Sequence, residues 1–266
     1  MNERLFVRER PRNSVKTLTM VGIIHLFRFW RKNLLKVTGM YVRLCLLLLI
    51  VAWGCKNVSR PGENSLTEGQ RYFLEIALGN EYGSNEPVIH KWTGTIRVAY
   101  YQSLPQPLER EFQRIVMEIN ALSHSITIEV VPEAVEANML VFVTDPATYA
   151  KYEPNAKPYL SENLGLVWVH WDNRSVIYKG SIYVNEDVDT TCQKHLLREE
   201  FTQSLGLLND SYRYPQSIFY QEWTCTTSYT ELDREVIGYI LDPRITPGMT
   251  RDDIIAVFNQ MNQSGF

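Results

Sequence analysis

The stretch from residue 195 to residue 211, HLLREEFTQSLGLLNDS, constrains the fold more than any other part of the chain. In an α-helix, residues four and seven positions apart lie on the same side, so Glu199, Gln203 and Gly206 share one stripe. Glu200 is rotated from that stripe by about 100°. Gly206 is expected to end the helix and to let the chain turn sharply. The sequence therefore predicts a helix over residues 190–205 with a polar stripe that leads into a turn.

This arrangement resembles the active-site helix of the metzincin zinc proteases, whose pattern H-E-x-x-H-x-x-G-x-x-H supplies three histidine ligands and a catalytic glutamate. The resemblance places the glutamate at Glu200 and the glycine at Gly206. The three ligand positions fall on Glu199, Gln203 and Asn209. It also implies that Phe219 stands where matrix-type proteases have a methionine beneath the metal. Because one carboxylate and two amides hold zinc poorly, no bound metal is predicted.

Two metal-binding alternatives stay open. Calcium could be held by the oxygen ligands of Glu199, Gln203, Asn209 and Asp210. A regrouped zinc site could use His195, Glu199 and Asp210. The favoured interpretation is a hydrogen-bond network that lines a cleft, in which Glu200 and Gln203 pair with the backbone or with Arg198, and Asn209 folds back toward Gln203.

Three stretches together resemble the bacterial domain of unknown function 2927 family. They are YFLEIALGNEYG with HKWTGTIRV, LREEFTQSLGLLNDS with YPQSIFY, and ELDREVIGYILDPRITPGMT. The resemblance runs from about Leu66 to the C-terminus and implies no particular activity. Together with the metzincin comparison, it predicts an α+β, zincin-like fold. That fold has a mixed sheet with backing helices, an active-site-type helix and a small C-terminal helical lobe.

Hydrophobic periodicity adds the other elements of this fold. It predicts helices over residues 67–78, 108–122, 230–241 and 250–261, and strands over residues 92–101, 126–131, 139–143, 164–171 and 176–184. His90, His124 and His170 are expected at the surface or at strand ends. Trp168, His170 and Trp171 would border the cleft and could receive a peptide or sugar, although packing is the commoner role of strand aromatics. Ser204 and Ser211 lack partners for a serine hydrolase, and Arg244 is expected to form an ion pair in the last turn.

Charge divides the chain into two regions. The first 54 residues carry ten basic and two acidic side chains, whereas the remainder carries 17 basic and 28 acidic ones, a formal net charge of −11. Such an acidic body argues against binding of nucleic acid, which requires a basic face.

The segment MYVRLCLLLLIVAWGC, which begins at Met40, is typical of a bacterial lipoprotein signal. Its apolar core is too short to span a bilayer, and residues 52–55 resemble the site at which a cysteine receives lipid. We therefore expect residues 1–54 to be a signal region with its true start at Met40, lipidation at Cys55, a tether over residues 55–66 and the folded domain over residues 67–266. An uncleaved N-terminal anchor is the alternative.

Besides Cys55, two cysteines lie outside the signal region, Cys192 and Cys225. In an oxidising compartment such a pair tends to form a disulfide, although two buried thiols are the alternative.

These expectations favour a cell-envelope lipoprotein with a degenerate metalloprotease-like domain. It would be anchored to the membrane by lipid, and its cleft would bind an extended peptide or an envelope protein without catalysis. Two alternatives stay open: an atypical metal-dependent hydrolase with Glu200 as general base, and a structural envelope protein.

Overall fold

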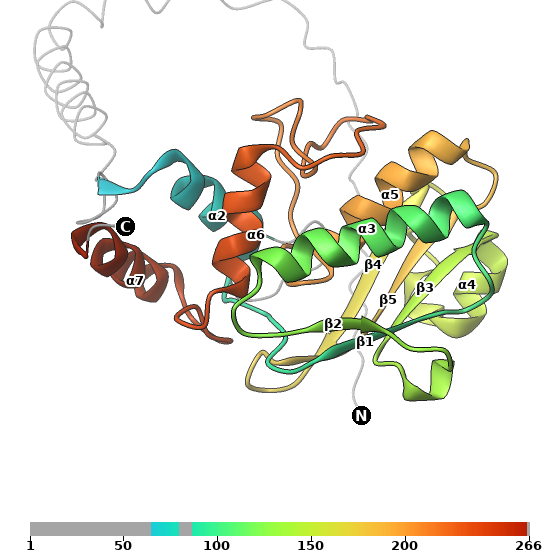
Figure 1. Ribbon diagram of the computed structural model, residues 1–266, viewed down its shortest axis with the longest axis horizontal. Coiled ribbons are helices and arrows are strands. Elements are labelled where there is room, and N and C mark those ends of the chain that lie inside the picture. Colours follow the sequence, from blue (N-terminus) through green and yellow to red (C-terminus); the bar gives the residue numbers. More distant parts are fainter. Residues whose placement is uncertain (1–64, 80–86, 265–266) are drawn as a thin grey trace, which may run out of the picture. The chain divides into compact units, whose positions relative to one another are not determined.

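The computed structural model of this 266-residue chain describes residues 65–79 and 87–264 (Figure 1). The expected signal region and Cys55 lie outside the described residues, and so does nearly all of the expected tether. Within the part of the chain that the structure describes, none of the helices has the length and apolar character that crossing a membrane requires.

A five-stranded, mostly parallel sheet forms the centre of the fold. Its strands are β1 (Ile96–Tyr100), β2 (Ile128–Val130), β3 (Met139–Thr144), β4 (Gly165–Trp171) and β5 (Ile177–Asn185), arranged in the order β2-β1-β3-β5-β4. β1 pairs in parallel with β2 and β3, and β3 pairs in parallel with β5. β4 is antiparallel to β5 and forms one edge of the sheet. The predicted mixed sheet is confirmed, with an α/β alternation of elements rather than separate α and β regions.

Two helices cover one face of the sheet. Figure 1 shows α3 (Gln106–Leu122) and α5 (Thr190–Gln203) lying across the same side. The central strand β3 is buried along its whole length, and its side chains alternate between two cores. Met139, Val141 and Val143 belong to the core that α3 and α5 cover.

A smaller core lies on the opposite face of the sheet, under α4 (Pro146–Tyr152). Leu140 and Phe142 of β3 contribute to it, together with Tyr149 of α4 and Tyr183 of β5. The sequence did not predict α4. This helix has only seven residues and begins at Pro146, so it carries too little periodic pattern to be recognised.

The remaining helices form the expected C-terminal lobe, joined by the first described helix. They are α2 (Glu68–Leu78), α6 (Glu231–Leu241) and α7 (Arg251–Gln263). Each begins with a capping box, whose N-cap residues are Thr67, Thr230 and Thr250. In such a box, side chains satisfy backbone N–H groups that the first turn leaves unpaired. Aromatic edge contacts join Phe73 of α2 to Tyr239 of α6 and Phe258 of α7.

The expected strand over residues 92–101 is wrong at its start, because β1 begins only at Ile96. The alternating residues before it serve a different purpose. The Lys91 ammonium donates to the carbonyls of Asp242 and Ile245, and the Trp92 indole donates to the carbonyl of Ser204. This segment therefore ties the C-terminal lobe and the end of α5 to the sheet.

Candidate functional site

A cavity of about 180 Å³ lies beside the sheet edge formed by β4. Residues 162–167 form one wall, residues 220–224 form another, and the polar side of α5 lines it with His195, Glu199, Glu200 and Gln203. Asp210, which follows the turn after α5, also lines the cavity. Four residues of α5 that the sequence analysis singled out therefore line the same cavity.

His195 and Glu199 form an ion pair along α5. The Nε2 atom of His195 lies 3.2 Å from a carboxylate oxygen of Glu199, and its Nδ1 atom lies 2.8 Å from the carbonyl oxygen of Thr226. Burial alone would lower the pKa of His195, but the bonds to Glu199 and to the Thr226 carbonyl outweigh it, so the pKa lies above its usual value. When His195 is protonated, both ring nitrogens can donate to these partners.

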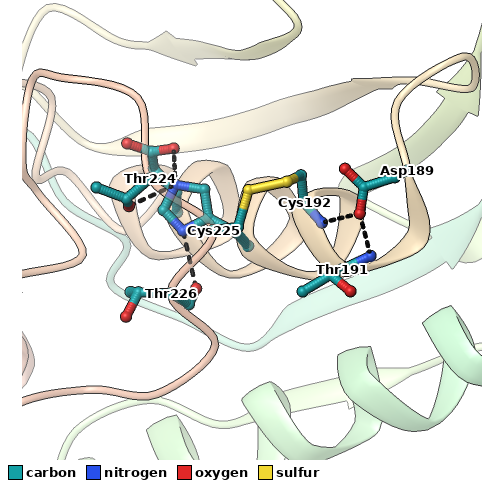
Figure 2. Close-up of a disulfide and its surroundings, with 8 residues drawn as sticks. Asp189, Thr191, Cys192, Thr224, Cys225 and Thr226 are labelled. Atoms are coloured by element: carbon teal, nitrogen blue, oxygen red, sulfur yellow. Dashed lines mark hydrogen bonds and ion pairs between the residues drawn. A yellow bond between two sulfur atoms is a disulfide. The ribbon is translucent and has the colours of Figure 1, made fainter.

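A disulfide between Cys192 and Cys225 holds the second wall in place, which confirms the predicted pairing. Figure 2 shows it linking the first turn of α5 to the segment that also carries Thr224 and Thr226. The same turn is capped by Asp189, whose carboxylate accepts from the N–H groups of Thr191 and Cys192. The wall is thus fixed to α5 by a covalent bond and by the hydrogen bond from His195.

Glu200 is buried beneath the start of β4. A Cβ atom at Gly165 would lie 2.3 Å from its carboxylate oxygen and 2.8 Å from a methyl carbon of Leu196. Such contacts are too short for any side chain, so the absence of a side chain at residue 165 is what lets the helix pass this close to the strand. Glu200 therefore lies at the junction of helix and edge strand.

The turn after α5 differs in one respect from the prediction. Gly206 has a φ of +114°, as a sharp turn requires. However, the amide of Gln203 donates to Asp210 at 2.7 Å, whereas the amide of Asn209 donates to the carbonyls of Glu75 and Asp210. Asp210, rather than Asn209, is therefore the residue after the turn that bonds to the side chain of Gln203. Asn209 packs instead against Gly79, at the end of α2.

Arg198 lies on the opposite side of α5 and does not pair with the cavity residues, contrary to the sequence-based interpretation. Its guanidinium binds Glu111 at 2.8 Å and Glu118 at 2.6 Å, both on α3, and stacks over the ring of Tyr229. It is fully buried. Its role is to join the two helices that cover the sheet.

Phe219, at the expected position of a methionine, is fully buried and packs against Tyr72 of α2. A buried carboxylate that the sequence analysis missed fixes this segment. Asp233 accepts from the hydroxyl of Ser217 at 2.6 Å and from the N–H of Ile218. The only sequence signal for Asp233 was its place in the capping box of α6.

The other histidines and tryptophans singled out in the sequence do not line the cavity. His124 is exposed, as expected. His90, expected at the surface or at a strand end, is buried and stacks on Trp171 with ring centroids 4.1 Å apart. His170 pairs with Glu153, and Trp168 lies near Tyr159 on the other face of the sheet. These aromatic residues make packing contacts within the fold, which is the commoner role of strand aromatics.

Other expectations away from the cavity agree with the structure. Arg244 pairs with Asp242 at 2.7 Å in the last turn. The hydroxyl of Ser204 donates to the carbonyl of Phe201, and that of Ser211 donates to Glu75. Neither serine contacts a histidine in these bonds, so neither is positioned as an activated nucleophile.

Among residues 65–79 and 87–264, one group of three donors is close enough for a shared ion, formed by Asp189, Cys192 and Cys225. Both of its thiols are joined in the disulfide and cannot act as thiolate ligands. In the cavity, His195 and Glu199 converge, but the next position on the stripe is the amide of Gln203, a weak zinc ligand.

The wall over residues 220–224 and Glu162 were not among the residues predicted from the sequence. The exposed Trp223, whose ring meets His195 edge-on at 6.5 Å, was one available signal. Another was the placement of Cys225 directly after this segment, because a predicted disulfide to α5 would bring its neighbours to the helix.

The fold and the cavity define an α/β protein with a polar cleft at the antiparallel edge of its sheet, and most ionisable residues among the described lining are acidic. The family model for proteins of unknown function DUF2927 matches residues 67–260. The chain therefore belongs to this family, and the match covers nearly the whole predicted domain. No curated protein matches the chain.

Proposed function

We propose that this protein is a degenerate metzincin-like domain that binds an extended peptide without hydrolysing it. Several features support the metzincin comparison. The helix with Glu200 underlies a cleft, Gly206 turns the chain sharply after it, and a mixed sheet with two backing helices precedes a helical lobe. Replacement of the three histidine ligands by Glu199, Gln203 and Asn209 favours binding over zinc-dependent hydrolysis.

The observation that carries the peptide proposal is that, among the described residues, no strand pairs with the outer edge of β4. In the antiparallel ladder, the N–H of Asn185 donates to the carbonyl of Leu164. Because successive residues of a strand alternate in direction, Gly165, Val167 and Val169 direct their backbone groups away from β5, toward the open edge. Two of these residues line the cavity. An extended peptide could thus add a strand to β4 while its side chains reach the cavity.

Position in the cell envelope is part of the same proposal. The lipoprotein signal pattern ending at Cys55 favours a lipid anchor, and the Cys192–Cys225 disulfide is of the kind that persists in oxidising compartments. A tethered domain with an open edge strand is suited to hold a segment of another envelope protein.

Hydrogen exchange on the full-length protein would test strand addition. We expect a seven-residue peptide, Thr-Val-Thr-Lys-Thr-Val-Thr, to slow exchange of the backbone amides of Gly165, Val167 and Val169. The same peptide with a central proline and flanking N-methyl groups should give no protection, because it cannot complete the ladder. Equal protection by both peptides, or protection confined to other strands, would contradict the proposal.

A second candidate, an atypical metal-dependent hydrolase, is favoured by the convergence of His195 and Glu199 beside Glu200. In that case Glu200 would serve as general base. Metal analysis of the purified protein separates the two candidates. Stoichiometric zinc that is lost in Glu199→Ala would favour the hydrolase and contradict non-catalytic binding.

A further inference from the structure

The cavity carries an excess of negative charge. Among the described residues that line it, five are acidic and none is lysine or arginine; the acidic residues are Glu162, Glu199, Glu200, Asp210 and Glu222. Within the same described lining, His195 is the single basic group, and it is paired with Glu199. Carboxylates thus line the cavity on both of its walls and on the side that α5 and the following turn form.

An acceptor atom on the helix points to the same chemistry. Gln203 lines the cavity and is only 4% exposed. Its amide nitrogen donates to Asp210 at 2.7 Å, which fixes the orientation of the group. Among the described residues, no hydrogen-bond donor is found for its carbonyl oxygen, which leaves that atom to accept from a ligand.

The size of the cavity limits what can enter. Pockets for whole small-molecule ligands are usually larger than about 300 Å³, whereas this cavity holds about 180 Å³. Such a volume suits one long side chain. Alternate residues of a strand added to β4 would direct their side chains toward α5, since the side-chain period of a strand is two.

We infer, on the basis of the peptide binding proposed above, that the cavity receives a lysine or arginine side chain of the bound peptide. The carboxylates of Asp210 and Glu222 hold the cationic head. The head also donates a hydrogen bond to the side-chain carbonyl oxygen of Gln203. The aliphatic stem lies along Leu164 and Leu196, which also line the cavity. Specificity for a basic residue thus comes from α5 and the two walls of the cavity. Affinity for an extended peptide backbone comes from β4.

Fluorescence anisotropy with three labelled peptides tests this inference on the full-length protein. The peptides are Thr-Val-Thr-X-Thr-Val-Thr with lysine, norleucine or glutamate at X, where norleucine keeps the stem and removes the charge. At low salt we expect the lysine peptide to bind roughly tenfold more tightly than the norleucine peptide. The advantage should shrink with added salt, because salt screens exposed charges. The glutamate peptide should bind most weakly.

Variants locate the charge selection. Asp210→Asn with Glu222→Gln should remove most of the lysine advantage while the norleucine peptide binds as before. Glu133→Gln, an exposed residue near the opposite edge of the sheet, is the matched control and should change nothing. Should Asp210→Asn fail to fold by circular dichroism, the exposed pair Glu162→Gln and Glu222→Gln replaces it.

The outcomes separate this inference from the proposed function. Equal binding of the lysine and norleucine peptides, or preference for glutamate, overturns the inference but leaves strand addition intact. Absence of binding by all three peptides overturns both. A dimer detected by light scattering, in which the backbone amides of β4 are protected from hydrogen exchange without any peptide, would likewise contradict a peptide as the occupant.

Discussion

At the scale of single residues, Gly165 sets how closely α5 can approach the edge strand. We predict that Gly165→Ala lowers the free energy of unfolding by about 1–3 kcal/mol, the usual cost of overpacking, because its Cβ would meet Glu200 and Leu196. Gly94→Ala is the matched control, since a Cβ there has no atom within 4 Å. Urea denaturation of both variants measures the difference. Equal stability of the two variants would show that the helix can shift away from β4.

The ion pair between His195 and Glu199 predicts a pH-dependent contribution to stability. Because the pKa of His195 is raised in the folded protein, the pair contributes fully below the unfolded pKa of about 6.5 and is lost as pH rises through the folded pKa. The stability advantage of the wild type over His195→Gln should therefore decrease between about pH 6 and pH 9.

Urea titrations of both proteins across this range measure the change, with the exposed His124→Gln as control. An advantage that grows with pH would mean that His195 is neutral in the folded protein at all these values.

Asp210 bonds to Gln203, whereas Asn209 bonds to Glu75. This difference shows which side-chain contacts the sequence alone does not predict. Helical spacing predicts that His195, Glu199 and Gln203 share one side of α5, and all three line the cavity. Beyond Gly206 no such rule applies. The direction of Asn209 is set by the carbonyl of Glu75 on α2, a residue distant in sequence.

At the scale of elements, the interface between α3 and α5 depends on Arg198. We predict that Arg198→Met destabilises the protein by about 3–5 kcal/mol, because it leaves the buried Glu111 without its partner on α5. Arg114→Met is the control and should cost less than about 1 kcal/mol, since Arg114 is 44% exposed. Chemical denaturation distinguishes the two. A small effect at Arg198 would mean that Glu111 becomes hydrated or protonated at little cost.

The disulfide joins α5 to the wall over residues 220–224. Its removal in the Cys192→Ala, Cys225→Ala double variant should lower the free energy of unfolding by about 3–4 kcal/mol, the value expected for a separation of 33 residues. Peptide affinity should also fall, because the wall is then held chiefly by the His195 bond. Denaturation and anisotropy provide the measurements, with alkylated but unreduced wild type as control. Unchanged affinity would show that this wall takes no part in binding.

Most helices and strands were predictable from sequence because their apolar residues recur with a regular period. The capping threonines also marked where α6 and α7 begin. The strand order was not predictable, since parallel pairing between β1 and β3 joins segments about 40 residues apart with no local signal. The cavity wall over residues 220–224 was not predictable either, because this segment forms neither helix nor strand and therefore has no periodic pattern.

At the scale of the whole molecule, the lipid anchor is the prediction with the widest consequence. We expect Cys55→Ser to leave an uncleaved precursor or to release the domain from the membrane fraction, because lipid attachment requires the thiol. Fractionation of cells, followed by mass spectrometry of the N-terminus, measures this. The conservative Cys45→Ser substitution within the apolar segment is the control. An intact, unmodified N-terminus at residue 1 in the wild type would refute the prediction.

The two edges of the sheet are unequal, and this bears on how the protein behaves when crowded. β2 has only three residues, and Asn120 bonds to its backbone at Ile128, so that edge offers little to another chain. β4 has seven residues, and no strand of the described part of the chain pairs with its outer side. Long open edges are where sheets of separate molecules join into aggregates. The carboxylates around the cavity would then act as gatekeepers, since two copies that approach through β4 bring like charges together. The same acidic rim that selects a basic guest would keep the protein from binding to itself.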